Sequence, residues 1–398
     1  MAATSLSVTI LADDLTGACD TGCLFAGNGP VGVAVDALLA AGDRPVLAVD
    51  TGTRTLPPEA AAAAIHAAAR GLGDRLLRGP AFKKIDSTMR GPIAVELDAL
   101  LQHGPPFTGA LVCPAFPAQH RVVRGGRLLV EGVPLHQSPI ARDPAFRGTS
   151  SELAALLAGP RPVVPLGLDE VRAGREKIVH VLEQQTGALV AADAETDADL
   201  ASLAGAALAV PGTLAAGAAG LGRALADALG LAAAPAPLPG GAARLVVVGS
   251  LHPASRAQLA ALAGRGVATL GVDHAGDADP AAAIAALRDG RPAVVASAMG
   301  GRDDTPAARR SMARRLARAA ADVIAGGHPD LVAVTGGETA RALLEALRPE
   351  RFDLLGAPAD GLALGRLGLA AGRTLPLLTK AGGFGGPTLL TTLLGGPS

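Results

Sequence analysis

The chain has no tryptophan and no tyrosine, and it has only seven phenylalanines. Proteins that bind single-stranded nucleic acid stack the bases on aromatic side chains, so this scarcity argues against such a surface. Positive charge is not in excess either, because 35 Lys and Arg residues are matched by 36 Asp and Glu residues. The arginine-rich stretch 309–318 has the spacing of a solvated helix face. We therefore expect no nucleic-acid partner.

Cysteine is also rare, and the three residues Cys19, Cys23 and Cys113 do not indicate a disulfide framework. Cys19 and Cys23 would share a helix face, but nothing with suitable spacing completes a metal site, so we interpret them as small buried hydrophobic residues. No apolar run of about 20 residues indicates a membrane span. The N-terminal segment lacks the basic region of a signal peptide. The expectation is a soluble, cytoplasmic protein without a membrane partner.

The chain of 398 residues is long enough for two domains, and 49% of its residues are hydrophobic, which suffices for two cores. In the first half, short apolar runs alternate with helix-like segments. This alternation is typical of a mainly parallel sheet with helices packed on it. The expected strands are 6–11, 31–35, 46–49, 82–85 and 110–113, and the expected helices are 16–26, 58–70 and 91–101.

The segment 231–241 is rich in Pro and Gly and has no periodicity, so it is interpreted as an interdomain linker. A second strand–helix series follows it. Its expected strands are 245–248, 267–272, 293–297, 331–334 and 375–378, and its expected helices are 254–263, 281–287 and 306–325. The sequence thus predicts an α/β fold with two domains, 1–232 and 242–398, each a mainly parallel sheet flanked by helices.

Two adjacent carboxylates, Asp13 and Asp14, stand where the first strand gives way to a helix, in the segment LADDLTGACDT. Ligands of open α/β sheets gather at the carboxyl ends of the strands. Carboxylates there can bind a metal, hold substrate hydroxyls or act as a general base. Helix capping is the alternative, but it explains one Asp more easily than two.

The segment KKIDSTMR, residues 83–90, also follows a predicted strand. It places two Lys, one Asp, two hydroxyls and Arg90 within eight residues, and an Arg side chain offers a planar fork that matches a carboxylate or phosphate. We favour an anionic-substrate site over a polar loop with a Ser/Thr cap. The Pro-rich segment 113–121, an apparent hairpin at 126–135 and Arg142-Asp143 follow; they fit a lid or rim and a purely structural loop equally well.

Glycine-rich turns follow strands of the second half. TGGET, residues 335–339, opens a helix, where glycines let backbone N–H groups approach a phosphate. TKAGGFGG, residues 379–386, repeats this design and adds Lys380, and Gly249-Ser250 ends a third strand. The turns match neither the P-loop nor the dinucleotide-binding fingerprint. Together they indicate a phosphate site of a less common type.

Motifs spread over nearly the whole chain resemble the four-carbon acid sugar kinase family of threonate, erythronate and 3-oxo-tetronate kinases. They are ADDLTGACDT (12–21), KKIDSTMRG (83–91), PAFPAQHR (114–121), GVPLHQSPIARDP (132–144), TGGETA (335–340), LGRL (364–367) and TKAGGFG (379–385). The resemblance implies an N-terminal domain that binds the sugar acid and a C-terminal domain that binds the nucleotide. It implies transfer of the γ-phosphoryl group of ATP to the terminal hydroxyl of the acid.

Carried over by position, the resemblance assigns residues to both sides of the reaction. On the substrate side these are Asp13, Asp14, Lys84, Asp86, Ser87 and Arg90. On the nucleotide side these are Ser250, Gly336, Gly337, Glu338, Asp360, Gly361, Leu362, Ala363, Gly382 and Gly383, to which the turn pattern adds Lys380.

The resulting hypothesis gives Asp13, Asp14 and Arg90 catalytic roles. Arg90, helped by Lys84, would grip the sugar-acid carboxylate, and one of the two aspartates would accept the proton of the attacking hydroxyl. The glycine turns and Lys380 would hold the triphosphate, with Mg²⁺ bridging its oxygens. Sugar acid and ATP are the expected partners, and homo-oligomerisation is left open. The alternatives are a kinase for another small hydroxy acid and a non-catalytic sugar-acid sensor.

Overall fold

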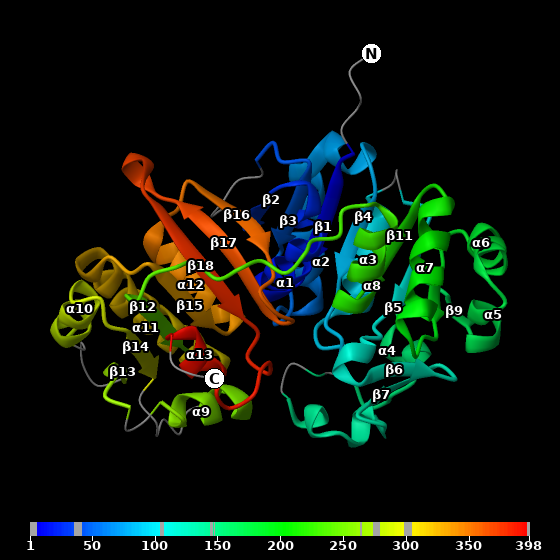
Figure 1. Cartoon of the computed structure of the whole chain (residues 1–398). Coiled ribbons are helices and arrows are strands. Elements are labelled where there is room, and N and C mark those ends of the chain that lie inside the picture. The colour runs from blue at the N-terminus through cyan, green and yellow to red at the C-terminus, as the bar shows by residue number, and fades with distance from the viewer. Residues whose placement is uncertain are drawn as a thin grey trace, which may run out of the picture. The chain divides into compact units, whose positions relative to one another are not determined.

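The computed structural model describes residues 6–35, 42–103, 107–143, 146, 148–262, 265–273, 279–297 and 305–395. The chain forms two compact units, and the division between them falls at residues 233 and 234 (Figure 1). The Pro/Gly-rich segment 231–241 contains this division and has no helix or strand. Each unit is a mainly parallel sheet flanked by helices, which confirms the predicted α/β fold class.

The described residues of the first unit form eight parallel strands in the order β2-β3-β1-β4-β11-β5-β10-β9. Most are continuous apolar runs, as strands covered on both faces require. Their bounds are β1 (Val8–Ala12), β2 (Val31–Val35), β3 (Val46–Asp50), β4 (Ala81–Lys84), β5 (Gly109–Cys113), β9 (Val163–Leu166), β10 (Leu189–Ala192) and β11 (Thr213–Gly217). The three strands after residue 160 were not predicted.

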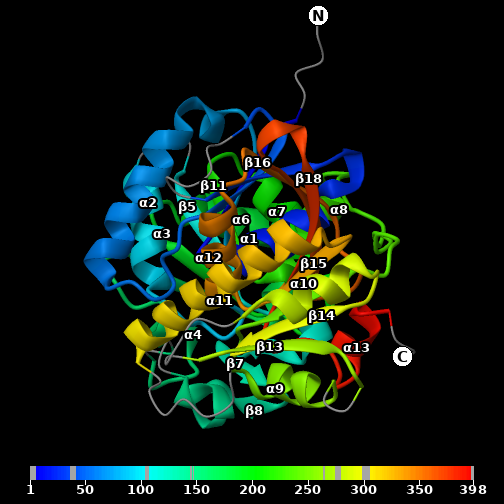
Figure 2. The ribbon, with the colours of Figure 1, turned by 90° about the vertical axis from the view of Figure 1, so that its left-hand side faces the viewer.

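Helices cover both faces of this sheet. Figure 2 shows α2 (Pro58–Leu72) and α3 (Ile93–Gln102) on one side of it and the layer that includes α7 and α8 on the other. The members of that layer are α1 (Leu15–Leu24), α5 (Leu168–Arg172), α6 (Arg175–Gln184), α7 (Asp197–Ala209) and α8 (Ala219–Ala228). The crossover from β1 to β2 contains α1, and the crossover from β3 to β4 contains α2 and runs in the opposite direction along the sheet. Because such crossovers are right-handed, their helices lie on opposite faces.

A small antiparallel sheet extends the first unit between β5 and the short helix α4 (Leu153–Leu156). Its strands are β6 (Arg121–Arg124), β7 (Arg127–Val130) and β8 (Val133–Pro134). The hairpin predicted at 126–135 is present as the antiparallel pair of β7 and β8. β6 adds a second hairpin that turns at Gly125-Gly126, where both glycines have positive φ. The buried carboxylate of Asp193 accepts hydrogen bonds from the N–H groups of both glycines and anchors this turn.

In the second unit, seven strands lie within the described residues, in the order β13-β14-β12-β15-β18-β17-β16. The first five are parallel, whereas β17 and β16 are antiparallel strands that were not predicted. The bounds are β12 (Arg244–Val248), β13 (Ala268–Val272), β14 (Ala293–Ser297), β15 (Leu331–Thr335), β16 (Arg351–Gly356), β17 (Leu362–Gly368) and β18 (Thr374–Lys380).

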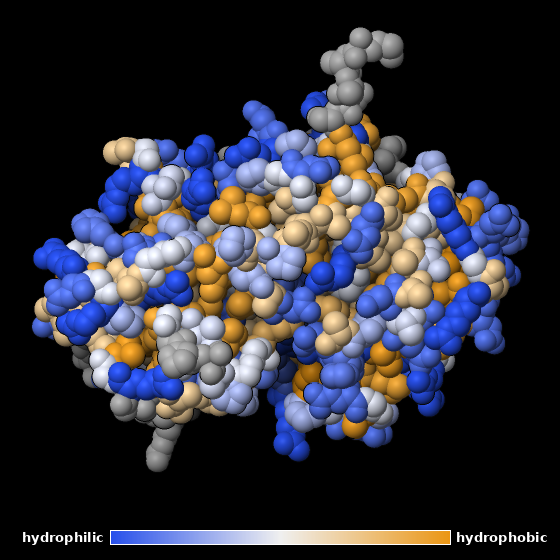
Figure 3. All heavy atoms as spheres, in the orientation of Figure 1, coloured by the Kyte–Doolittle hydropathy of each residue, from blue (hydrophilic) through white to orange (hydrophobic). Residues whose placement is uncertain are grey.

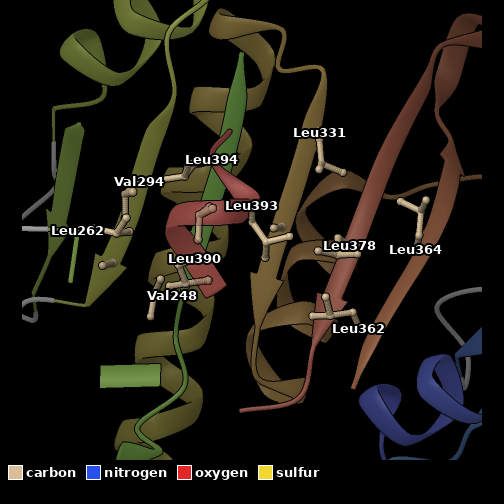
Figure 4. Close-up of a cluster of buried hydrophobic side chains, with 13 residues drawn as sticks. Val248, Leu262, Val294, Leu331, Leu362, Leu364, Leu378, Leu390, Leu393 and Leu394 are labelled. Atoms are coloured by element: carbon tan, nitrogen blue, oxygen red, sulfur yellow. The ribbon is translucent and has the colours of Figure 1, made fainter. Parts of the chain in front are cut away.

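Helices α10 (Ala281–Arg288), α11 (Pro306–Gly327) and α12 (Gly337–Leu347) pack side by side on one face of this sheet. The other face is covered by α9 (Pro253–Ala260) and α13 (Leu389–Leu393). Figure 4 shows how the leucines of α13 pack against residues from several strands, among them Val248, Leu331 and Leu378. This cluster ties the end of the chain to the middle of the second sheet.

The surface carries few large exposed hydrophobic side chains; among the described residues these are Leu6, Leu77, Val133 and Leu251. On the face shown in Figure 3, hydrophilic and hydrophobic residues are interspersed. No helix in the described part of the chain has both the length and the apolar character needed to cross a membrane.

Candidate active site

The polar segments that follow β1, β3 and β4 meet at the carboxyl edge of the first sheet. β1 lies between β3 and β4, and the register pairs Ala12 with Asp50 on one side and with Lys84 on the other. The chain leaves β1 for β2 and β3 on one side and returns to β4 on the other. Loops at such a reversal of strand order are the usual ligand sites of α/β sheets.

Asp13 is fully buried and is held by an arginine that the sequence did not suggest. Arg54, four residues beyond β3, donates from Nε to Asp13 Oδ2 at 2.7 Å and from Nη2 to Asp13 Oδ1 at 2.8 Å. Burial by itself raises the pKa of Asp13, but the charge of Arg54, with Lys83 and Lys84, outweighs it and lowers the pKa below its usual value. Asp13 is therefore stabilised in its ionised form, and both of its oxygens are already engaged.

Asp14 serves as a helix cap and also faces the site. Its Oδ1 accepts a hydrogen bond from the Gly17 N–H at 2.7 Å, while its Oδ2 accepts one from Arg54 Nη1 at 2.5 Å. Its side chain is 22% exposed, whereas that of Asp13 is 0% exposed. A Cβ on residue 17 would lie 2.7 Å from Asp14 Oδ1 and 3.4 Å from the Lys84 ammonium, so glycine is needed there. Asp14 therefore caps the helix and also faces the candidate site, so the two interpretations of the Asp pair are compatible.

Asp86 and Arg90 form a two-pronged ion pair in the loop after β4. Arg90 donates from Nε and Nη2 to the two oxygens of Asp86 at 2.8 Å each, and from Nη1 to Asp143 at 2.9 Å. Burial raises the pKa of Asp86, but Arg90, Arg54 and Thr88 outweigh it and hold it well below the usual value. The charge of Asp86 in turn raises the pKa of Arg90. Arg90 thus has two acidic partners within the protein.

The remaining predicted residues of this loop are also buried. Lys84 donates to the carbonyl of Ile85 at 2.9 Å, and the hydroxyl of Ser87 accepts a hydrogen bond from Arg121 at 2.6 Å. Lys83 points to the other side of the sheet, where it forms a fully buried ion pair with Glu96 at 2.6 Å. The two lysines of the KKIDSTMR segment therefore face different surroundings, as alternate residues of a strand must.

In the second unit, the predicted nucleotide residues lie on turns at a single edge of the sheet. β12, β15 and β18 are parallel neighbours, so Ser250, Gly336 and Gly382 follow strand ends that lie side by side. β17 runs antiparallel to β18 and pairs Leu362 with Lys380, which brings the turn 359–362 to the same edge. The residues brought together are Ser250, Gly336, Gly337, Glu338, Asp360, Gly361, Leu362, Ala363, Lys380, Gly382 and Gly383.

The turns interlock through glycines and Ser250. Gly336 has a φ of 92° and its N–H donates to the carbonyl of Lys380 at 3.1 Å. The ammonium of Lys380 is buried among its own loop: it donates to the carbonyl of Ala381 at 3.0 Å and to that of Gly382 at 3.3 Å. Burial lowers the pKa of Lys380 to about 8. These hydrogen bonds indicate that Lys380 helps to hold the turn 379–386 in its conformation.

Substitution of Gly382 by Ala is expected to destabilise the second unit, because the new Cβ would overlap the hydroxyl oxygen of Ser250. Overpacking of this kind costs about 1–3 kcal/mol. Urea unfolding should show this loss together with weaker nucleotide binding. The matched control is Gly386→Ala in the same loop, where no atom lies within 4 Å of the new Cβ. Equal stability of the two variants would contradict the interlocked turn.

Family models and full-length relatives agree on what the chain is similar to. A model for a sugar-binding N-terminal domain matches residues 8–225, and one for a nucleotide-binding C-terminal domain matches residues 245–390. D-threonate kinases of Cupriavidus necator and Bordetella bronchiseptica are 38% and 36% identical, over 97% and 95% of this chain and 96% and 94% of their own. The chain belongs to the four-carbon acid sugar kinase family. It is therefore a phosphotransferase, as predicted.

Other family members and solved structures extend this similarity. A 3-oxo-tetronate kinase of Methylobacterium radiotolerans is 32% identical over 96% of this chain and 97% of its own. A solved protein of Salmonella typhimurium LT2 superposes with a TM-score of 0.77 at 21% identity, covering 97% of this chain and 98% of its own. One from Haemophilus influenzae gives 0.71 at 19% identity, with 97% and 99% covered. At identities this low, the two solved structures support the fold of this chain and nothing about its activity.

Proposed function

We propose that this kinase transfers the γ-phosphoryl group of ATP to the terminal hydroxyl of a four-carbon sugar acid of the threonate, erythronate or 3-oxo-tetronate class. Residues 1–232 would bind the acid and residues 242–398 the nucleotide. The observation that carries the proposal is the Asp13–Asp14 pair, held by Arg54 at the carboxyl edge of a parallel sheet. The names of full-length relatives support the substrate class.

Asp14 is the better placed of the two aspartates to accept the proton of the attacking hydroxyl. Both oxygens of Asp13 take hydrogen bonds from Arg54, and its side chain is not exposed. Each oxygen of Asp14 takes one hydrogen bond and keeps further lone pairs, and part of the side chain is accessible. A general base must reach the proton that it removes. Asp13 would then keep Arg54, and through it Asp14, in place.

The turns of the second unit would cradle the triphosphate. The first N–H groups of α12 have no partner within the helix, and its N-terminus favours an anion. Ser250 and the glycines at 336–337 and 382–383 leave the backbone accessible to phosphate oxygens. Mg²⁺, which neutralises charge on these oxygens when bound, would be held chiefly by phosphate and water. No group of three or more His, Cys, Asp or Glu side chains suited to a metal lies among the described residues.

A substrate panel tests the proposal. The full chain is incubated with MgATP and aldonates or oxo-acids of three to six carbons, and ADP release is measured by a coupled assay. We expect turnover with a four-carbon acid, and a ³¹P NMR signal of a primary phosphate ester in the product. Preference for a longer or shorter acid would favour the kinase for another hydroxy acid. Binding of an acid without any ADP release would favour the non-catalytic sensor.

A further inference from the structure

Arg121 stands at the beginning of β6, next to the loop that carries Ser87 and Arg90. Two backbone hydrogen bonds with Phe116, at 2.7 and 3.2 Å, fix its main chain. Its side chain turns toward the candidate site and donates from Nη1 to Ser87 Oγ at 2.6 Å. Ser87 is buried and uses its oxygen as the acceptor, so its own proton can be donated to another group. The small antiparallel sheet thus contributes a cation to the site.

The guanidinium of Arg121 is only partly satisfied. Its Nε–H is buried without a hydrogen-bond partner. None of the ion pairs within 4 Å that join described residues involves Arg121, whereas Arg54 and Arg90 each have acidic partners. Burial lowers the pKa of Arg121, and the more distant carboxylates of Asp86 and Glu131 only partly offset the burial and the repulsion by Arg90. A partly buried cation that is incompletely paired costs folding free energy, so Arg121 is not explained by a contribution to stability.

The network around Arg54 and Arg90 has a different charge balance. It joins the carboxylates of Asp13, Asp14, Asp86 and Asp143 through these two guanidinium groups, and with the nearby Lys84 ammonium counted it keeps an excess of one negative charge. Such a network suits the hydroxyls of a ligand, because carboxylates accept hydrogen bonds from them. A ligand carboxylate would meet repulsion there. An anion is better received where positive charge is uncompensated.

From these contacts we infer that Arg121, together with the hydroxyl of Ser87, binds the carboxylate of the acid substrate. The inference rests on the proposed function and assigns the carboxylate to Arg121 in place of Arg90. Nε–H and the second terminal nitrogen of Arg121 form the planar fork that pairs with two carboxylate oxygens. The substrate then has a defined direction: its acid end lies at Arg121 and Ser87, and its terminal hydroxyl lies at Asp14, near the Lys84 ammonium that borders Gly17.

Calorimetric binding to the full chain without nucleotide tests this assignment. The probes are threonate and threonamide, which replaces the carboxylate by a neutral amide. Wild-type protein should bind the acid at least tenfold more tightly. Arg121→Gln should weaken binding of the acid by about 10- to 100-fold, the usual range for a charged hydrogen bond, and leave that of the amide unchanged. Arg121→Lys, which keeps the charge, should bind the acid with an affinity between those of the wild type and Arg121→Gln. The matched control is Arg127→Gln on the neighbouring strand, where the arginine is largely exposed and pairs with Glu152.

Equal losses for acid and amide in Arg121→Gln, or no loss, would overturn the inference, as would failure of the wild type to prefer the acid. Melting temperature separates a binding role from a structural one: Arg121→Met should melt no lower than wild type, and a marked decrease would count against the assignment. ATP turnover is measured in parallel. Selective acid binding that depends on Arg121 without phosphoryl transfer would support the inference and defeat the proposed kinase activity. Phosphoryl transfer that does not change when Arg121 is replaced would support the kinase activity and defeat the inference about Arg121.

Discussion

Replacement of Asp14 by Asn is expected to reduce kcat by about 100- to 10,000-fold, the range that a general base contributes. The amide cannot accept the proton of the attacking hydroxyl, but its oxygen can still cap the helix at Gly17. The second unit is untouched, so nucleotide affinity should stay at the wild-type value. Single-turnover kinetics with the preferred four-carbon acid and titration with ATP measure the two quantities.

The control for this variant is Asp197→Asn, because Asp197 is an exposed aspartate in the first turn of α7. It changes the same chemical group at the start of a helix far from the site in sequence, and it should leave kcat unchanged. A thermal melt of Asp14→Asn near that of wild type would show that the cap survives. Wild-type turnover in Asp14→Asn would refute the role of Asp14 as base and direct attention to Asp13.

The second large effect concerns stability. Arg54→Met is expected to lower the free energy of unfolding by about 3–5 kcal/mol, because it leaves the fully buried Asp13 without its counter-ion. Activity should fall as well, since Asp14 loses the hydrogen bond from Arg54 Nη1. Urea unfolding followed by circular dichroism measures the change. Arg70→Met, at an exposed arginine in the last turn of α2, is the matched control.

A double variant tests the reason for this loss. Asp13→Asn combined with Arg54→Met removes the buried charge together with its partner and should recover most of the stability. A double variant as unstable as the single one would mean that Arg54 acts through packing. The pKa of Asp13 also predicts a pH dependence. Because this pKa is lowered from 3.8 in the folded state, the stabilisation is complete above pH 3.8 and is lost as the pH falls through the lowered value.

The α/β class and most of the strands in each half could be predicted because they depend on local pattern. Apolar runs such as 46–49 and 293–297 are buried strands, and the predicted helices α2 and α11 each begin at a Pro. The antiparallel pair β16 and β17 was missed, since strands that contain glycines lack a clear apolar alternation. Strands β9 to β11 were not predicted either, in a segment whose Ala-rich helices are as apolar as its strands.

Local sequence also indicated which polar segments would lie together at the candidate site, because loops after parallel strands share one edge of a sheet. Asp13, Asp14, Asp86 and Arg90 lie on such loops and contact one network. The sequence could not reveal Arg54, which stands alone in its loop, since its importance comes from pairing with residues about 40 positions away. A charge whose partners are distant in sequence leaves no local pattern.

The sequence by itself determined that two α/β units would form and which polar loops would lie at the carboxyl ends of their strands, because both follow from short-range periodicity and from residues next to strand ends. Only the tertiary structure decided how the charges are shared. It engages Asp13 with Arg54 and Arg90 with Asp86 and Asp143, and it buries the Lys380 ammonium in its own turn. It also leaves the Nε–H of Arg121 without a partner. Burial and ion pairing depend on side chains that meet from distant segments, and these fix which group remains available for a ligand.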